Sequence, residues 1–250
     1  MLLDAKDIVE WIKEYADLAR KDTLIIGISG GVDSSLVSTL CAETGLKTIV
    51  VKMPIDQLEE QNNLSNAHAS WLLEKYSANV ICRSKDLSSV FHQFCDGLTA
   101  EESSNLGLAN TRSRLRMMML YQLASTSNGL VVGTGNKVED FGIGFFTKYG
   151  DGGVDISPIA DLYKTEVRQM ASSLGILQSI IDAAPTDGLW DDGRTDEDQI
   201  GATYEELEWA MEYAEGDPLD DRKKEVLEIY RGFHTANKHK MVAIPIFKGS

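Results

Sequence analysis

The stretch TLIIGISGGVDSS, residues 23–35, decides the fold. Its first part, 23–28, is mostly apolar and β-branched, which predicts a buried strand. The strand ends at one serine and two adjacent glycines, 29–31, and glycines let the backbone approach a ligand closely. We expect a helix over 32–44, whose first N–H groups and positive dipole end would face an anion. The sequence therefore predicts a strand, loop and helix that bind phosphate.

Asp33 lies at the start of that helix, where a carboxylate would repel phosphate unless it held a bridging divalent cation. The simpler alternative is an ordinary turn, in which Ser29 or Asp33 only caps the helix. The stretch also lacks the Gly-Lys-Ser/Thr ending of a Walker loop. SGGVDSS instead resembles the signature of the ATP pyrophosphatase, or PP-loop, superfamily, which cleaves ATP between the α and β phosphates. The motif indicates this superfamily and leaves the substrate open.

The composition suits one α/β domain with a full apolar core, because the chain has 250 residues of which 43% are hydrophobic. The formal net charge of −15 argues against a nucleic-acid partner, since such binding depends on Lys and Arg contacts to phosphates. The three cysteines, Cys41, Cys82 and Cys95, form no CxxC pair. We see no signal peptide and no apolar run long enough for a membrane span, so we expect a cytoplasmic protein with free thiols.

Hydrophobic periodicity predicts helices and strands that alternate after an N-terminal amphipathic helix at 4–20. Further strands are expected at 47–51, 79–83 and 130–133, and further helices at 56–74, 87–94, 101–126, 201–212 and 220–237. This alternation favours an open, mostly parallel sheet. Ligands of such sheets bind beyond the carboxyl ends of the strands, so residues 52–61 should border the nucleotide.

The helix expected at 101–126 has an unusual second half, MMMLYQLA from Met117, which is apolar almost all the way round. It must be buried on more than one side, either in the centre of the monomer or, as we favour, at a subunit interface. Arg112, Arg114 and Arg116 precede this half, and Arg114 projects from a different face than the other two. Surface ion pairing is the simplest interpretation for each arginine, and periodicity alone does not select a ligand contact.

A second dense segment, 133–167, begins at the end of an expected strand and contains seven glycines. This composition suits a long active-site loop better than a hairpin. The segment places Lys148, Asp151, Asp155 and Lys164 among apolar and glycine neighbours. We expect these charges to be buried, and buried charges need partners such as phosphates or a metal ion.

Several further runs make the resemblance specific: GTGNKVE, FFTKYGDGGVD, SPIADLYKTEV, PTDGLWDDGRTDEDQIGATYEEL and the terminal HK. Together with SGGVDSS, and in this order, they resemble the ammonia-dependent NAD synthetase family over residues 27–240, nearly the whole chain. The resemblance implies an adenine nucleotide alpha hydrolase-like fold of the PP-loop type, with an open, mostly parallel twisted sheet flanked by helices. It also implies a single NAD synthetase domain over 1–250 that acts as a C–N ligase in NAD biosynthesis.

The resemblance assigns binding residues by position. Its ATP contacts are Gly27, Ile28, Ser29, Gly30, Gly31, Val32, Asp33, Ser34, Thr134, Lys164 and Thr186. Asp33 and Glu139 would hold Mg²⁺ on the ATP phosphates. The contacts to deamido-NAD (nicotinic acid adenine dinucleotide) would be Arg114, Lys148, Asp155, His239 and Lys240. In the family this dinucleotide lies at a homodimer interface, which is consistent with an apolar helix after Arg114.

The implied reaction converts deamido-NAD to NAD. The carboxylate of deamido-NAD attacks the α phosphorus of ATP, pyrophosphate leaves, and ammonia then displaces AMP from the acyl adenylate. Both reactants of the first step are anionic, so Mg²⁺, Lys164 and backbone N–H groups are needed to offset their repulsion. We therefore assign catalytic roles to Lys164 and to Asp33, which would hold the Mg²⁺. Ammonium must lose a proton before it attacks. Our hypothesis is that Asp151, between two glycines and near Lys148, is a buried carboxylate that accepts this proton.

Residues 182–201 are rich in Asp and Gly, and in the family this segment is a lid over the active site. We expect it to become ordered through Thr186 when substrates bind. Glutamine-using members carry an additional amidohydrolase domain with a catalytic cysteine, for which 250 residues leave no room. Free ammonia, supplied directly or by a separate glutaminase, is therefore the expected nitrogen donor.

Two other functions remain open at this point. Another PP-loop enzyme, such as a tRNA thiolase or a GMP synthetase, would share Asp33 and the loop. The acidic charge, the absence of paired cysteines and the downstream motifs oppose it. A nucleotide-binding regulatory protein without catalysis is the second alternative, and the presence of Asp33, Glu139 and Lys164 argues against it.

Overall fold

The computed structural model of the chain describes residues 4–57, 59–186 and 194–249. Its strands form a four-stranded parallel sheet in the order β3-β2-β1-β4, so the expected open parallel sheet is confirmed. The strands are β1 (Thr23–Gly27), β2 (Lys47–Lys52), β3 (Val80–Ser84) and β4 (Gly129–Val131). In the register of β1, Gly27 lies opposite Val51 of β2. The carboxyl ends of these two strands therefore meet at the same edge of the sheet.

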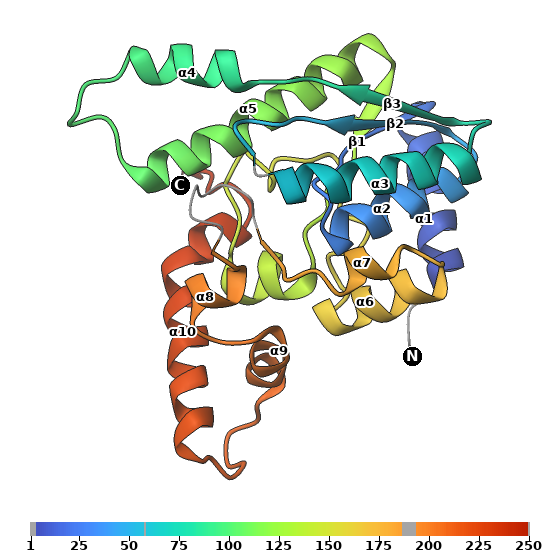
Figure 1. Cartoon of the computed structure of the whole chain (residues 1–250). Helices are drawn as coiled ribbons and strands as arrows, with labels where there is room; N and C mark the ends of the chain where they lie inside the picture. Colours follow the sequence, from blue (N-terminus) through green and yellow to red (C-terminus); the bar gives the residue numbers. More distant parts are fainter. Residues whose placement is uncertain (1–3, 58, 187–193, 250) are drawn as a thin grey trace.

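Helices connect and cover the strands (Figure 1). They are α1 (Ala5–Leu18), α2 (Val32–Glu43), α3 (Glu59–Lys75), α4 (Ser88–Asp96), α5 (Asn105–Thr126), α6 (Lys164–Ser173), α7 (Gln178–Ile181), α8 (Asp196–Ile200), α9 (Tyr204–Glu212), α10 (Asp221–Met241) and a π-helix, η1 (Val138–Ile143). The expected helices are present, with ends that differ by a few residues. Helices η1, α6, α7 and α8 were not expected from periodicity. Three of them, η1, α6 and α8, lie wholly or partly in a Gly- or Asp-rich stretch, and α7 is only four residues long.

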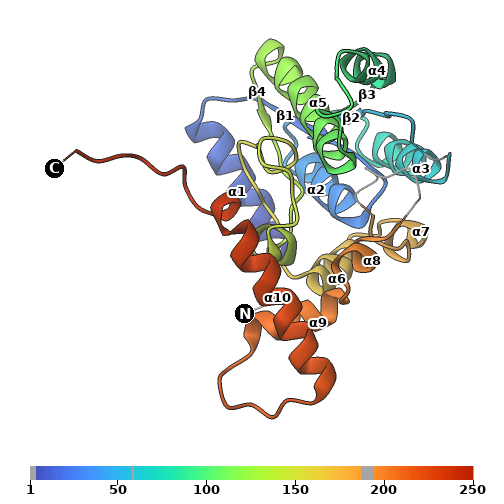
Figure 2. The ribbon, with the colours of Figure 1, turned by 90° about the vertical axis from the view of Figure 1, so that its left-hand side faces the viewer.

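The central strand β1 is buried on both faces. Leu24 and Ile26 belong to an apolar cluster with α1, α2, α6 and α7, whereas Ile25 belongs to a second cluster with α4 and α5. All three side chains have no exposed surface. A strand covered on both faces has a continuous apolar sequence rather than an alternating one. For this reason TLIIGI could be predicted as a buried strand from the sequence. Figure 2 shows α2 and α5 on opposite sides of the strands.

A third apolar cluster lies outside the sheet and joins η1, α9 and α10 through Val138, Tyr204 and Leu227. Figures 1 and 2 show α9 and α10 beside the sheet layers, with the last residues extending away from the end of α10. This cluster fixes η1, which follows β4, against elements from the last quarter of the chain. Residues far apart in sequence are thereby brought to one end of the sheet.

Helix α5 buries only one side of its apolar half within this chain. Met117, Leu120 and Ala124 pack against the sheet, while Met118 is 60% exposed. Within this chain, one side of the apolar half is therefore buried. Burial of a second side, at a subunit interface, stays a prediction. None of the described helices is both long and apolar enough to span a membrane.

A buried histidine joins α2 and α3. His68 has no exposed surface, its Nε2 lies 2.8 Å from Ser38 Oγ, and its ring stacks on Trp71 with centroids 5.7 Å apart. Burial lowers the pKa of His68 to about 4. The neutral imidazole is therefore the form that the fold accommodates.

We expect acid to destabilise the fold through His68. Between pH 6.5 and 4 the unfolded chain binds a proton that the folded chain excludes, so stability is present above pH 6.5 and is lost as the pH falls. The loss from this residue should approach about 3 kcal/mol near pH 4. Urea unfolding of wild type and His68→Leu at several pH values measures it. The variant should show a shallower dependence on pH, and an equal slope would contradict the assignment. His92→Gln is a control, since the His92 side chain is 57% exposed.

Candidate active site

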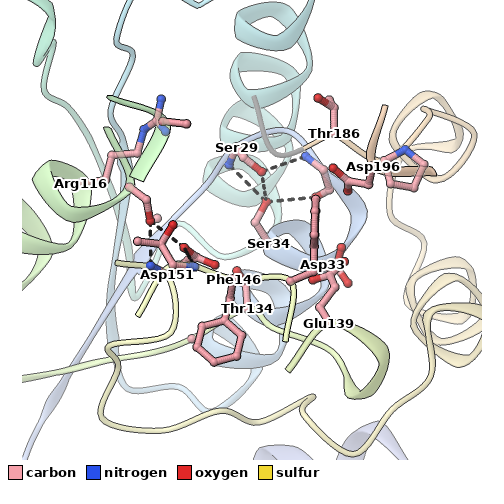
Figure 3. A pocket seen from close by; sticks show the side chains of 18 of the residues that line it. Ser29, Asp33, Ser34, Arg116, Thr134, Glu139, Phe146, Asp151, Thr186 and Asp196 are labelled. Carbon is pink, nitrogen blue, oxygen red and sulfur yellow. Dashed lines mark hydrogen bonds between the residues drawn. The ribbon is translucent and has the colours of Figure 1, made fainter. Parts of the chain in front are cut away.

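A cavity of about 510 Å³ lies beyond the carboxyl ends of the strands, where a parallel sheet is expected to bind its ligand. Ile28 follows β1, Met53 follows β2 and Val132 follows β4, and all three line it. Side chains from α2, α5, η1 and α6 complete the walls (Figure 3). The sheet edge and these elements thus enclose one site.

The loop between β1 and α2 lines this cavity and leads into the N-terminus of the helix. Gly31 is the N-cap of α2, and no side chain caps the helix, which excludes the simple capping role considered for Ser29 or Asp33. Ser29 N–H donates to Ser34 Oγ at 3.2 Å, and Gly31 N–H donates to Ser29 Oγ at 3.2 Å, which holds the loop closed. Gly30 has a φ of 94°, which only glycine adopts readily. This geometry suits an anion at the end of α2.

Lys164 is the centre of the charged part of the site. It is the first residue of α6, it is 2% exposed, and its Nζ lies 2.6 Å from Asp33 Oδ2 and 3.0 Å from Glu139 Oε1. Asn136 Nδ2 donates to the other oxygen of Asp33 at 3.1 Å. Three segments, α2, η1 and α6, therefore converge on one buried ammonium group.

The charges of this cluster are set by burial and by one another. Burial raises the pKa of Glu139, although the nearby Lys164 opposes the shift. Burial also acts to lower the pKa of Lys164, but Asp33 and Glu139 outweigh it, so that pKa lies above its ordinary value. Lys164 is accordingly a permanent cation at neutral pH.

Asp33 and Glu139 offer a donor set that fits Mg²⁺ only together with other oxygen ligands. Among the described residues there is no group of three or more His, Cys, Asp or Glu side chains that could hold a metal ion. Mg²⁺ characteristically takes one or two carboxylates and completes its shell with phosphate oxygens and water. Both carboxylate side chains are 16% exposed, so each retains a surface beside the cavity. The two residues thus fit a metal that arrives with a phosphate ligand.

The structure brings the residues assigned to ATP together around this cavity. Those that line it are Gly27, Ile28, Ser29, Gly31, Val32, Asp33, Ser34, Thr134, Lys164 and Thr186. Gly30 shapes the loop without lining the cavity. In Figure 3, Ser29, Ser34, Asp33 and Glu139 lie toward one side, and Arg116 and Asp151 lie toward the other. The role of each residue in binding ATP stays a prediction.

Four of the five residues assigned to deamido-NAD, Arg114, Lys148, His239 and Lys240, lie close together next to the cavity. Lys240 lines the cavity, and its Nζ donates to Phe146 O at 2.7 Å. Lys148 Nζ donates to His239 O at 3.2 Å, and Arg114 Nε donates to Lys148 O at 3.2 Å. This set leads from the cavity to the outer side of α5, where Arg114 borders a smaller pocket.

Asp155 lies beside that outer side but is used structurally within this chain. Its Oδ1 accepts from Tyr121 OH at 3.0 Å, and its Oδ2 accepts from Val131 N–H at 2.7 Å. Asp155 thus links its own segment, which follows β4, to both α5 and β4. Whether it also contacts a dinucleotide stays a prediction.

The expectation that four charges of the Gly-rich segment are buried is correct only for Lys164. Asp151 is exposed at the cavity wall, and Asp155 is exposed as well. Asp151 Oδ1 accepts from Ser113 Oγ at 2.6 Å and from Thr147 N–H at 3.1 Å. The carboxylate is therefore fixed by hydrogen bonds rather than by burial, because the glycines around it carry no side chains to cover it.

Arg116 is one functional candidate that sequence reasoning did not select. Its Nε donates to Met53 O at 3.1 Å and its side chain lines the cavity, whereas Arg112 stacks on the ring of Phe91 at 4.4 Å. The helical pattern placed Arg112 and Arg116 on one face but gave no means of choosing between them. The two side chains differ in the structure because Arg116 contacts the segment after β2, whereas Arg112 contacts α4.

Asp140 lies next to Glu139 but does not line the cavity, and its unusual environment was not apparent from the sequence. Burial, together with the charges of Glu139 and Asp151, raises the pKa of Asp140 to about 8. A Cβ at Gly135 would lie only 2.2 Å from Asp140 Oδ1, so a larger residue there would displace the carboxylate. No composition signal distinguishes this aspartate from the other acidic residues of the Gly-rich segment.

The expected lid is described only at its two ends. Residues 187–193 lie outside the described part of the chain. Thr186 Oγ1 donates to Arg194 O at 3.2 Å, and Asp196 N–H donates to Pro185 O at 3.0 Å. Within the expected loop, Asp196–Ile200 forms a helix, α8, whose N-cap Thr195 and Asp198 make a capping box. Asp196 is 5% exposed and lines the cavity.

Comparison with known proteins places these features in a family. The family described as NAD synthase matches residues 4–242. An NH(3)-dependent NAD(+) synthetase of Alkaliphilus metalliredigens is 36% identical over 248 residues, which cover 96% of this chain and 95% of the relative. The chain is therefore similar to these enzymes along nearly its whole length.

Two solved structures have the same fold. NMN synthetase from Francisella tularensis superposes with a TM-score of 0.86 at 30% identity and covers 97% of both chains. An NH3-dependent NAD synthetase from Campylobacter jejuni, in complex with the nitrate ion, superposes with a TM-score of 0.77 at 25% identity, over 98% of this chain and 97% of that chain.

The charge balance around Lys164 leads to a stability prediction. Lys164→Gln should lower the free energy of unfolding by about 3–5 kcal/mol near pH 7.5, because it leaves Asp33 and Glu139 facing each other without a cation. Glu139→Gln should cost less, since Lys164 keeps Asp33 as its partner. Urea denaturation of both variants without nucleotide measures the order. A larger loss for Glu139→Gln would contradict this account of the cluster.

Proposed function

The chain belongs to the NAD synthase family, and we propose on this basis that it is an ammonia-dependent NAD synthetase. The reaction is the ATP-dependent amidation of deamido-NAD to NAD, which passes through an acyl adenylate and releases AMP and pyrophosphate. The chain is thus a ligase that forms a C–N bond. One observation carries the chemical argument: the buried Lys164 ammonium lies at the uncapped N-terminus of α2, where the phosphates of ATP would gain both charge and hydrogen bonds.

The first step needs positive charge near the phosphates. The N–H groups at the start of α2 would bind the phosphate oxygens, and Lys164 would stabilise the charge that develops on the departing pyrophosphate. Asp33 and Glu139 would hold Mg²⁺, which supplies further positive charge against the phosphates when it is bound. Asn136 keeps Asp33 in place by its hydrogen bond of 3.1 Å. These assignments are supported by the convergence of the residues on one cavity.

The second step needs neutral ammonia close to the acyl adenylate. We assign the removal of a proton from ammonium to Asp151, which lines the cavity on the side away from Asp33 and Glu139 (Figure 3). Ser113 and the N–H of Thr147 both donate to its Oδ1 and fix the orientation of the carboxylate. An exposed carboxylate of this kind can exchange its proton with water after each turnover.

One comparison favours a second acceptor. The superposing structure from Francisella tularensis is that of an NMN synthetase, and it matches this chain with the TM-score of 0.86. Nicotinate mononucleotide carries the same nicotinate carboxylate as deamido-NAD but lacks the adenylate half. The same ATP chemistry on this smaller acceptor is therefore our second candidate activity.

We also propose a homodimer. Arg114, assigned to deamido-NAD, borders a pocket on the outer side of α5, beside the exposed Met118 and Tyr149. Exposed apolar side chains next to an assigned ligand contact support an interface at this face. The free thiols of Cys41, Cys82 and Cys95 support a reducing, cytoplasmic location.

An assay with separate acceptors and nitrogen donors tests the function. The protein is supplied with ATP and Mg²⁺, with deamido-NAD or nicotinate mononucleotide, and with ammonium or glutamine. We expect NAD and AMP in equal amounts from deamido-NAD and ammonium, and no product from glutamine. Faster turnover of nicotinate mononucleotide would select the second candidate. AMP without an amide product would contradict both, and would indicate another acceptor.

The assignment of Asp151 predicts a change in pH dependence. Asp151→Asn should lower kcat by about 10²-fold or more at pH 7, because general-base catalysis contributes about this much, and the loss should shrink at higher pH, where free ammonia is abundant. Steady-state rates from pH 6.5 to 9.5 measure it. Asp161→Asn is a matched control, since that side chain is 82% exposed and does not line the cavity. Full activity of Asp151→Asn with an unchanged pH optimum would show the assignment to be wrong.

A further inference from the structure

Tyr204 lies behind the phosphate site and touches three of its charged residues. It is the first residue of α9 and has no exposed surface. Its hydroxyl oxygen lies 2.6 Å from Glu139 Oε1 and 3.2 Å from Asp196 Oδ2. Its ring lies below Lys164, with 4.6 Å between Nζ and the ring centroid. One side chain thus connects η1, α6 and α8.

A single phenol hydrogen cannot satisfy both carboxylates. A tyrosine hydroxyl has one O–H to donate, and the two acceptor oxygens lie on different elements. The shorter distance, to Glu139, marks the stronger donation, and Asp196 receives the hydrogen only if the hydroxyl turns away from Glu139.

The site has more negative than positive charge. Asp33, Glu139 and Asp196 surround Lys164, which is the cation of this cluster. The Tyr204 O–H is the further donor that Glu139 receives beside the ammonium. Its aromatic face also attracts the ammonium and limits the positions that Lys164 can take. Glu139 is therefore fixed between two groups, Nζ of Lys164 and the hydroxyl of Tyr204.

We propose that Tyr204 is a positioning residue for the phosphate site, because its hydroxyl holds Glu139 in the geometry for a metal–phosphate ligand and joins it to Asp196. The proposal rests on the proposed use of ATP with Mg²⁺. Tyr204 does not line the cavity and acts through Glu139. Removal of the hydroxyl leaves a buried carboxylate oxygen with one donor fewer and free to turn toward Lys164 alone.

Tyr204→Phe tests the role of the hydroxyl, since it keeps the ring and its contact with Lys164. Titration calorimetry without turnover should show a roughly tenfold weaker affinity for ATP with Mg²⁺, as expected when a charged group loses a hydrogen bond, and little change without Mg²⁺. The concentration of Mg²⁺ at half-maximal activity should rise by a similar factor. Tyr76→Phe is the matched control, because it removes a hydrogen bond of 2.9 Å to Glu43 outside the cavity, and both quantities should be unchanged.

Asp196→Asn and the double variant test the link to α8. If the hydroxyl joins Glu139 to Asp196, the effects of the two single substitutions on Mg²⁺-dependent affinity should be non-additive. Additive effects, or wild-type affinity in a folded Tyr204→Phe protein, would overturn the proposal. If Tyr204→Phe does not fold, an unchanged Mg²⁺ dependence in Asp196→Asn overturns it instead. A wild-type protein that makes no NAD would contradict the proposed function, while the calorimetric comparison would still decide the role of Tyr204.

Discussion

The site depends on one interaction, the pairing of the buried Lys164 ammonium with two carboxylates. A lysine that is 2% exposed is tolerated only beside opposite charge, and here Asp33 and Glu139 provide it. These partners come from α2 and η1, while Lys164 begins α6. Their pairing therefore requires the sheet, the Gly-rich segment and the α9–α10 region to be assembled together. The cluster thus links the stability of the fold to the catalytic role that we propose for it.

The same cluster explains how an acidic protein can bind an acidic substrate. The chain has a formal net charge of −15, and the carboxylates next to Lys164 exceed its single positive charge. This excess disfavours a free phosphate and favours a phosphate that brings a cation with it. The uncapped N-terminus of α2 adds donors without adding side-chain charge. This charge balance is consistent with the proposed use of a nucleotide that carries Mg²⁺.

Much of the fold was predictable because its signals are local. A strand buried on both faces gives an apolar run, and the glycine with positive φ at position 30 marks the turn into α2. Helices α6 and α8 were harder to predict, because their first residues serve the site rather than an apolar face. The motifs assigned Arg114, which borders the outer pocket, but did not select Arg116, which lines the cavity. On a helix, residues two apart face different directions, and which direction meets the ligand depends on packing.

The sequence by itself determined the strand, glycine loop and helix of the phosphate site, the parallel sheet and the family, because each is written in contiguous residues. Only the tertiary structure decided that Lys164 is buried and that Asp151 is exposed. It also decided that Tyr204 lies under Lys164, 40 positions away in the sequence numbering. Burial and charge pairing are properties of surfaces that meet in space. Residues from η1, α8 and α9 acquire them only when the third apolar cluster brings these elements together, while α6 packs in the first cluster.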